Sequence, residues 1–297
     1  MNKYIVGGIV FGSEIEFPEL IKEKNKEIDV LVKYGEVPEK LEGASDEHVL
    51  FSHNQKDQVI FEIPEIARYL VNKTTDITIQ LIDEERAEDA HKYILTFILG
   101  VISFKKGYFP LHGGGIVYNG EAYMFTGKSG AGKSTTLAGL QQRGFSSVGD
   151  DISNLFYTEG KTRVHPCFPR FKLWDESLKI LNARDSGEYK LRSDMDKFLV
   201  PMKRFHSTPI SVKRIYHLVE ENAEMSFNPI SKNIKIKNLI QNSYKPWMVK
   251  TFKLQQKHFE LVTQISDSVE ITEFRRPKNQ KQLDQMFEFL IQDIKGE

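Results

Sequence analysis

A glycine-rich stretch near the middle of the chain places the strongest constraint on its fold. Residues 127–134 match the phosphate-binding pattern G-x-x-x-x-G-K-[S/T] without a mismatch. The glycines of this pattern let the backbone curl so that successive N–H groups point at phosphate oxygens. Lys133 is then expected to reach the β- and γ-phosphates, and the hydroxyl of Ser134 to ligate Mg²⁺. The other predicted nucleotide-binding residues are Gly127, Lys128, Ser129, Gly130, Ala131, Gly132 and Thr135.

The residues on either side of this loop have the character that such a loop requires. The apolar run at 122–125 predicts a strand that leads into the loop, and residues 134–142 predict a helix that leads out. The N-terminus of that helix would face the phosphates. If the pattern were a chance match in a flexible loop, neither the strand before it nor the helix after it would be expected. The sequence therefore predicts a nucleotide-binding site.

A tight hairpin is predicted immediately before the loop. Two β-like runs, 116–118 and 121–125, flank Asn119-Gly120, and Asn-Gly is suited to a type I′ turn because both of its central residues need positive φ. The strand that enters the loop is thus expected to pair with its predecessor in antiparallel fashion. Neighbouring strands that are joined by a helix are usually parallel. The hairpin therefore argues against a fold in which every pair of neighbouring strands is joined by a helix.

Two adjacent carboxylates follow the loop after one predicted helix and one short predicted strand at 145–148. They are Asp150 and Asp151, directly after Gly149. One carboxylate can hold Mg²⁺, and the other can accept a proton from an attacking hydroxyl. An ordinary Asp-rich turn is the alternative, but the position so soon after the loop favours a role in phosphoryl chemistry.

The N-terminal region is predicted to be rich in β-structure and to be separate from the nucleotide-binding part. We expect an accessory or recognition region over 1–85 and a nucleotide-binding domain over 86–297. A short helix is predicted over 63–72, and a longer, largely apolar and buried helix over 84–105. The predicted strands of this region lie at 4–11, 28–32, 49–51, 58–61 and 76–82.

The remainder of the chain alternates strand and helix patterns. We predict a hairpin from residues 151–157 and 162–165, a proline-framed loop over 166–174, and a mobile charged loop over 185–197. The first loop carries cations and aromatic rings that could shape a substrate pocket, and a packed crossover is the alternative. Lys190 and Arg192 of the second loop could approach phosphates, and a solvated charge run is the alternative. Predicted helices lie at 177–181, 231–241, 246–254 and 283–294, and predicted strands at 198–201, 210–219 and 269–274.

Composition limits the classes of partner. The 41 basic and 41 acidic residues balance, so no net field would attract nucleic acid or a membrane surface. Cys167 is the single cysteine, which rules out an intrachain disulfide and favours a reducing compartment. No run approaches the ~18 apolar residues of a membrane span, and the N-terminal apolar stretch is typical of a strand rather than a signal peptide. A cytoplasmic protein is expected.

These motifs together resemble a known family. His112-Gly113, the Asn119-Gly120 hairpin, the loop at 127–134, Arg143-Gly144 and the Asp150-Asp151 pair resemble the catalytic core of HPr serine kinase/phosphorylase. The Gly-Asp-Asp string is also similar to the ATP-dependent phosphoenolpyruvate carboxykinases, which share that core. More loosely, the whole chain looks like the stand-alone HPr-kinase-like proteins, some of which phosphorylate peptide precursors in lasso-peptide pathways.

The resemblance implies a fold and a chemistry. It implies an α/β P-loop kinase core with a mixed sheet, ATP with Mg²⁺, and transfer of the γ-phosphoryl group to a serine hydroxyl. Lys133 would stabilise the β- and γ-phosphates, and Ser134 and Asp150 would ligate the metal. Asp150 and Asp151 would share metal binding and general-base duty, with Asp151 favoured as the base. His112 matches the family histidine that interacts with the catalytic carboxylates, and homo-oligomers occur in the family.

Two departures from the family pattern concern the acceptor. Thr135 stands where HPr kinases usually carry glutamate, and residues 166–174 do not look like the stretch by which those kinases engage HPr. Both put HPr itself in doubt as the substrate. The chain is also much shorter than a full carboxykinase.

The sequence therefore predicts an ATP/Mg²⁺-dependent kinase that acts on a hydroxyl, with a serine of a peptide or small protein as the expected acceptor. A kinase for a small metabolite and a nucleotide-binding adaptor without transfer activity are the alternatives. A peptide acceptor predicts an open groove beside the Asp pair. A metabolite predicts a closed pocket with few exposed aromatic side chains.

Overall fold

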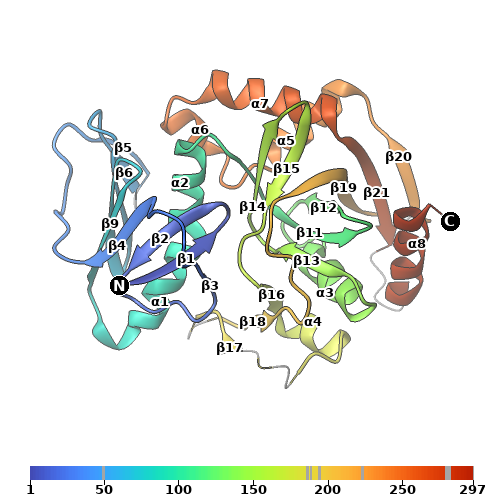
Figure 1. Ribbon diagram of the computed structural model, residues 1–297, viewed down its shortest axis with the longest axis horizontal. Helices are drawn as coiled ribbons and strands as arrows, with labels where there is room; N and C mark the ends of the chain where they lie inside the picture. The colour runs from blue at the N-terminus through green and yellow to red at the C-terminus, as the bar shows by residue number, and fades with distance from the viewer. Residues whose placement is uncertain are drawn as a thin grey trace.

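The protein contains two large β-sheets and one small sheet (Figure 1). The structure is a computed structural model that describes residues 1–48, 51–184, 187, 189–192, 195–221, 224–277 and 282–296. The first large sheet, drawn in blue, lies beside the N-terminus, and the second lies toward the C-terminus. No helix among these residues is both long enough and apolar enough to cross a bilayer.

The first large sheet is built almost entirely from the N-terminal region. Its order is β3-β1-β2-β4-β9-β8-β7-β6-β5, and its strands are antiparallel except where β4 pairs with β2 and β9. Part of the predicted strand at 49–51 lies outside the described residues. The strands are β1 (Asn2–Val6), β2 (Ile9–Ser13), β3 (Ile21–Lys22), β4 (Val30–Tyr34), β5 (Ser45–His48), β6 (Phe51–His53), β7 (Gln58–Ile63), β8 (Ala67–Asn72) and β9 (Asp76–Leu81).

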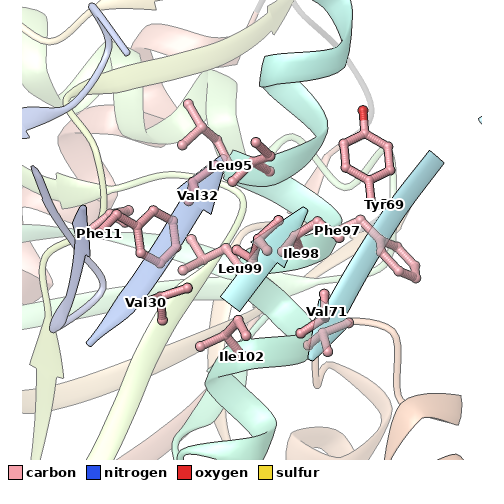
Figure 2. Packing of buried hydrophobic residues seen from close by; sticks show 14 of the residues in the cluster. Phe11, Val30, Val32, Tyr69, Val71, Leu95, Phe97, Ile98, Leu99 and Ile102 are labelled. Carbon is pink, nitrogen blue, oxygen red and sulfur yellow. The ribbon is translucent and has the colours of Figure 1, made fainter. Parts of the chain in front are cut away.

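A long helical segment covers this sheet, as the apolar pattern over 84–105 predicts. It runs through η1 (Glu84–Arg86), α1 (Ala87–Tyr93), a π-helical stretch, η2 (Ile94–Ile98), and α2 (Leu99–Lys105). Figure 2 shows Leu95, Ile98, Leu99 and Ile102 packed against strand residues that include Val32 and Val71. Burying each of these aliphatic side chains contributes about 1.5–3 kcal/mol. The predicted burial of this helix is confirmed.

The predicted short helix over 63–72 is wrong. Residues 67–72 form β8, which pairs with β7 on one side and β9 on the other. Ala67, Tyr69 and Val71 are fully buried while their neighbours are half-buried, which is the period of two that a strand imposes. A turn at Glu65, whose φ is +62°, reverses the chain before this strand. The hydrophobic pattern is short, and cross-strand pairing decides its conformation.

The second large sheet is mixed, as predicted for the α/β class. Strand β19 is parallel to both β12 and β21, while β12 is antiparallel to β11 in the predicted hairpin. Asn119 and Gly120 have φ of +46° and +75°, as a type I′ turn needs. The strands are β10 (Phe109–Leu111), β11 (Gly113–Tyr118), β12 (Glu121–Gly127), β13 (Ser146–Gly149), β14 (Ser153–Thr158), β15 (Lys161–His165), β19 (Ile210–Glu221), β20 (Ser226–Pro229) and β21 (Glu270–Pro277).

Helices cover both faces of this sheet. Alternate residues such as Phe125 and Tyr216 pack against α3 (Lys133–Gln142) and α8 (Leu283–Lys295). Their neighbours Met124 and Ile215 pack on the opposite face against α5 (Lys232–Gln241) and α7 (Gln255–Ser268). The helix predicted over 246–254 is shorter, α6 (Trp247–Thr251), and α7 was not singled out from the sequence.

A small sheet lies between the two large ones. It contains β16 (Arg170–Trp174), β18 (Lys197–Pro201) and β17 (Tyr189–Lys190), in the order β16-β18-β17, and α4 (Asp175–Ile180) follows β16. The prediction of a loop over 166–174 is therefore wrong for its second half. The prediction of a mobile loop over 185–197 is wrong at β17; residues 185, 186, 188, 193 and 194 of that stretch lie outside the described residues.

The contact between α3 and α8 makes a test of this packing. A Cβ atom on Gly139 would lie 2.0 Å from Cζ of Phe287, a ring that is fully buried. Gly139→Ala gains about 1 kcal/mol of helix propensity, but overpacking costs about 1–3 kcal/mol. We expect a net loss of stability in urea denaturation. In a Phe287→Leu background the same substitution should become neutral or stabilising; an equal loss in both backgrounds would contradict this packing.

Candidate active site

The loop between β12 and α3 has the backbone that the glycine pattern requires. Gly127 has φ of +142°, and Gly130 and Gly132 lie in the left-handed region at +84° and +82°. A Cβ on Gly127 would lie 2.7 Å from the carbonyl oxygen of Leu218, so only glycine fits where β12 passes β19. The loop ends at the first turn of α3, where the backbone N–H groups have no partners within the helix.

Lys133 folds back over this loop. Its Nζ donates to the carbonyl oxygens of Gly127 and Lys128 at 2.9 and 3.0 Å, and its side chain is almost fully buried. Burial lowers the pKa of Lys133, because it disfavours the charged form. Lys128 itself is exposed and contributes its carbonyl group. The predicted lysine therefore sits in the hollow of the loop with its ammonium group directed at the loop backbone.

Ser134 and Asp150 are brought together beneath the loop. The Ser134 hydroxyl donates to Oδ1 of Asp150 at 3.0 Å, and the backbone N–H of Lys172 donates to Oδ2 at 2.9 Å. Asp150 is only 2% exposed, and burial raises its pKa. The predicted pair of metal ligands is thus adjacent in space, although 16 residues separate them in the sequence.

Ser134 and Asp150 suit a Mg²⁺ ion that phosphate oxygens also bind. They do not suit a metal ion that protein side chains hold alone. Mg²⁺ is usually bound by one or two carboxylates, with phosphate oxygens and waters completing an octahedron. Ser134 and Asp150 supply one hydroxyl and one carboxylate. Within the described ranges no cluster of three or more His, Cys, Asp or Glu side chains could hold a metal by itself. The residues present therefore fit an ion that is shared with a nucleotide.

Asp151 is held by a buried lysine. Its Oδ2 lies 2.5 Å from Nζ of Lys172, and the Lys172 side chain is 3% exposed. Burial alone would raise the pKa of Asp151, but the surrounding cationic groups, Lys172 first among them, together outweigh it and hold the pKa well below its usual range. Asp151 also has φ of +69°, which is uncommon for a residue other than glycine and is typical of functional sites.

His112 approaches Asp151 mainly through the backbone. Its Nδ1 lies 3.0 Å from the carbonyl oxygen of Asp151 and 3.9 Å from Oδ1 of the carboxylate. A carbonyl oxygen can only accept, so Nδ1 carries the hydrogen in this contact. Burial lowers the pKa of His112, which favours the neutral ring. The predicted histidine is therefore beside the carboxylate pair, where it fixes the turn that presents Asp151.

The glycines after His112 allow β11 to pass under α3. A Cβ on Gly114 would lie 2.3 Å from the carbonyl oxygen of Gly149 and 2.6 Å from a methyl group of Leu137. The run at 113–115 therefore has room for backbone only. This close approach places Gly149, at the end of β13, opposite Gly115 of β11. The carboxylates that follow β13 therefore lie near His112, which directly precedes β11.

A cleft of about 410 Å³ opens over these groups. The predicted residues His112, Lys133, Ser134, Thr135 and Asp151 line it, while Asp150 lies buried below. The Thr135 hydroxyl is 2.8 Å from that of Ser177, which links α3 to α4. Residues that the sequence analysis did not assign to the site also line the cleft: Lys172, Trp174, Lys197, Glu220 and Arg276.

Arg276 is placed against the loop by sheet topology. The parallel strands β12, β19 and β21 end at one edge, so Glu220 and Arg276 reach the loop that follows β12. Arg276 Nε donates to the carbonyl oxygen of Ala131 at 3.0 Å, and its Nη2 lies 2.7 Å from Oε2 of Glu220. The ion pair between Arg276 and Glu220 therefore supports the glycine-rich loop at Ala131.

The pair of Asp151 and Lys172 makes a test of the site's stability. Lys172→Met leaves a buried carboxylate without its cation, which costs about 3–5 kcal/mol in comparable pairs. We expect a large fall in the urea midpoint, and partial recovery in Lys172→Met/Asp151→Asn, where the charge is also removed. Lys56→Met breaks an exposed pair with Glu42 and serves as the control, with little change expected. Equal effects at both sites would contradict the buried arrangement.

Comparison with solved structures finds a weak likeness. No family model matches the chain, and no curated protein matches its sequence. A solved structure of the Hpr(Ser) kinase/phosphatase from Coxiella burnetii matches with 14% identity over 63% of this chain and 95% of that one, at a TM-score of 0.32. A TM-score this low carries no argument about fold or function.

Proposed function

We propose that the protein is an ATP/Mg²⁺-dependent kinase that phosphorylates a hydroxyl group, with a serine of a peptide or small protein as the acceptor. The observation that carries the proposal is the contact between Ser134 and Asp150 at 3.0 Å, directly below Lys133 and beside Asp151. These side chains come from separate elements, and each has a role in phosphoryl transfer. A loop that matched the glycine pattern by chance would have no reason to lie over a buried carboxylate.

The nucleotide would be bound by the loop and by α3. The backbone N–H groups of residues 128–133 and the N-terminus of α3 suit the phosphates of ATP. Lys133, which now bonds to the loop's own carbonyl groups, would exchange those contacts for the β- and γ-phosphates. Ser134 and Asp150 would hold Mg²⁺, which neutralises charge on the phosphate oxygens when bound.

Asp151 would orient and deprotonate the acceptor. The acceptor oxygen forms a bond to the γ-phosphorus, the bond from that phosphorus to the bridging oxygen breaks, and ADP leaves with the electron pair. The acceptor proton passes to the Asp151 carboxylate, which is ionised at neutral pH and retains acceptor capacity beyond its contact with Lys172. Lys172 holds this carboxylate directly, and His112 fixes the Asp151 backbone through its carbonyl oxygen.

The walls of the cleft favour a peptide over a small metabolite. Trp174 lines the cleft and is 52% exposed, although it is one of the largest apolar side chains. A closed metabolite pocket would cover such a ring, whereas an open groove leaves it free to contact an extended chain. The acceptor we propose is therefore a segment that lies across Trp174 and presents its serine to Asp151.

Nucleotide binding is the first property to test. Lys133→Ala removes the ammonium group in the hollow of the loop, so the affinity for Mg·ATP should fall at least about tenfold, as for the loss of a charged hydrogen bond. Isothermal titration calorimetry measures this directly. Lys203→Ala, at an exposed lysine that does not line the cleft, is the control and should bind normally. Unchanged affinity in Lys133→Ala would contradict the proposed nucleotide site.

The role of Asp151 is tested by separating binding from transfer. Asp151→Asn keeps the shape of the side chain but removes the base, so transfer should fall by about 10²–10⁴-fold while Mg·ATP still binds. Incubation with labelled ATP and serine-containing peptides, read by mass spectrometry, measures the transfer. Wild-type transfer rates in Asp151→Asn would remove it as the base, and phosphorylation of small metabolites alone would contradict the peptide acceptor.

A further inference from the structure

The small sheet brings a second lysine to the cleft, in addition to the one in the glycine-rich loop. Lys197 begins β18, where it pairs with Trp174 of β16, and both side chains line the cleft with Lys133 and Asp151. The Lys197 carbonyl oxygen also accepts from the backbone N–H of Leu191 at 2.7 Å. The position of this residue is thus fixed by backbone bonds on both of its sides.

Each of the other cations that line the cleft already has a partner. Lys172 is paired with Asp151, Arg276 with Glu220, and Lys133 with the carbonyl groups of its own loop. In the part of the chain that the structure describes, no carboxylate forms an ion pair with Lys197. Among the described residues, no carboxylate therefore neutralises the charge of Lys197 by direct contact.

Trp174 holds this charge without neutralising it. The Nζ of Lys197 lies 5.5 Å from the centre of the Trp174 ring, within the range of a cation–π contact. Such a contact orients an ammonium group but leaves its hydrogens free to donate. Lys197 and Lys133 line the same cleft.

We propose that Lys197 is a second phosphate-binding lysine, which contacts the phosphoryl group during its transfer and stabilises the charge on its oxygens. The inference rests on the proposed kinase function and adds a catalytic residue to it. Lys133 would hold the phosphates from the loop side, and Lys197 from the opposite wall, on the side of the acceptor. Because the three equatorial oxygens carry charge in the transition state, a donor placed there lowers the barrier to transfer.

Lys197→Met tests the proposal, since methionine keeps the aliphatic stem over Trp174 and removes the charge. The probes are Mg·ADP and Mg·ADP with aluminium fluoride, a mimic of the phosphoryl group in flight. We expect less than a threefold change in affinity for Mg·ADP, and a loss of about 10²-fold for the aluminium fluoride complex and for the rate of transfer. Lys197→Arg should restore part of both losses. Lys203→Met, an exposed lysine beyond the end of β18, should leave both unchanged.

The outcomes distinguish this proposal from the kinase function itself. Wild-type protein that fails to bind Mg·ADP, or binds it no more tightly with aluminium fluoride, contradicts the kinase function and the role of Lys197 together. Wild-type protein that binds the mimic tightly while Lys197→Met does so equally well overturns only the role of Lys197. An equal loss for Mg·ADP and the mimic would also overturn it, because Lys197 would then bind the ground state alone.

Discussion

Lys172 is the residue on which the candidate site depends. Its backbone N–H donates to Asp150 and its Nζ to Asp151, so one residue of β16 holds both carboxylates. Two adjacent carboxylates in a buried turn would otherwise repel each other and favour protonation. With Lys172 in place, burial raises the pKa of Asp150 while the lysine lowers that of Asp151. The two carboxylates therefore lie in different electrostatic environments, although they are adjacent in the sequence.

The parts of the site that lie close together in the sequence could be predicted, and the parts that meet through sheet pairing could not. The glycine pattern of 127–134 and the Asn119-Gly120 hairpin depend on local backbone geometry, which residue types reveal directly. Lys172 lies 22 residues after Asp150 in the sequence and reaches it only because β16 comes to lie beside the turn that follows β13. A signal was present nonetheless: in 170–174, polar residues alternate with Phe171 and Leu173, which is the period of a strand.

The overall fold shows the same limit. The buried helix over 84–105 was predictable because its apolar run is long. The antiparallel pair before the loop was predictable from its turn residues, whereas the mixed sheet was expected only from the family resemblance. Helix α7 was not predictable from an apolar pattern, because its buried residues include His258 and Ser266, which no hydrophobic scale marks as core. His258 is placed by its contact with Ser243, 2.9 Å away in the preceding segment. Polar residues become core residues only when tertiary structure supplies their partners.

The small sheet connects the N-terminal region to the wall of the cleft. One face of β16 packs through Phe171 and Leu173 into the core beside α3, while Leu199 of β18 belongs to the core of the first large sheet. Tyr189 of β17 donates to Oε1 of Glu19 at 2.5 Å. The strands that carry Lys172 and Lys197 therefore pack against the cores of both large sheets.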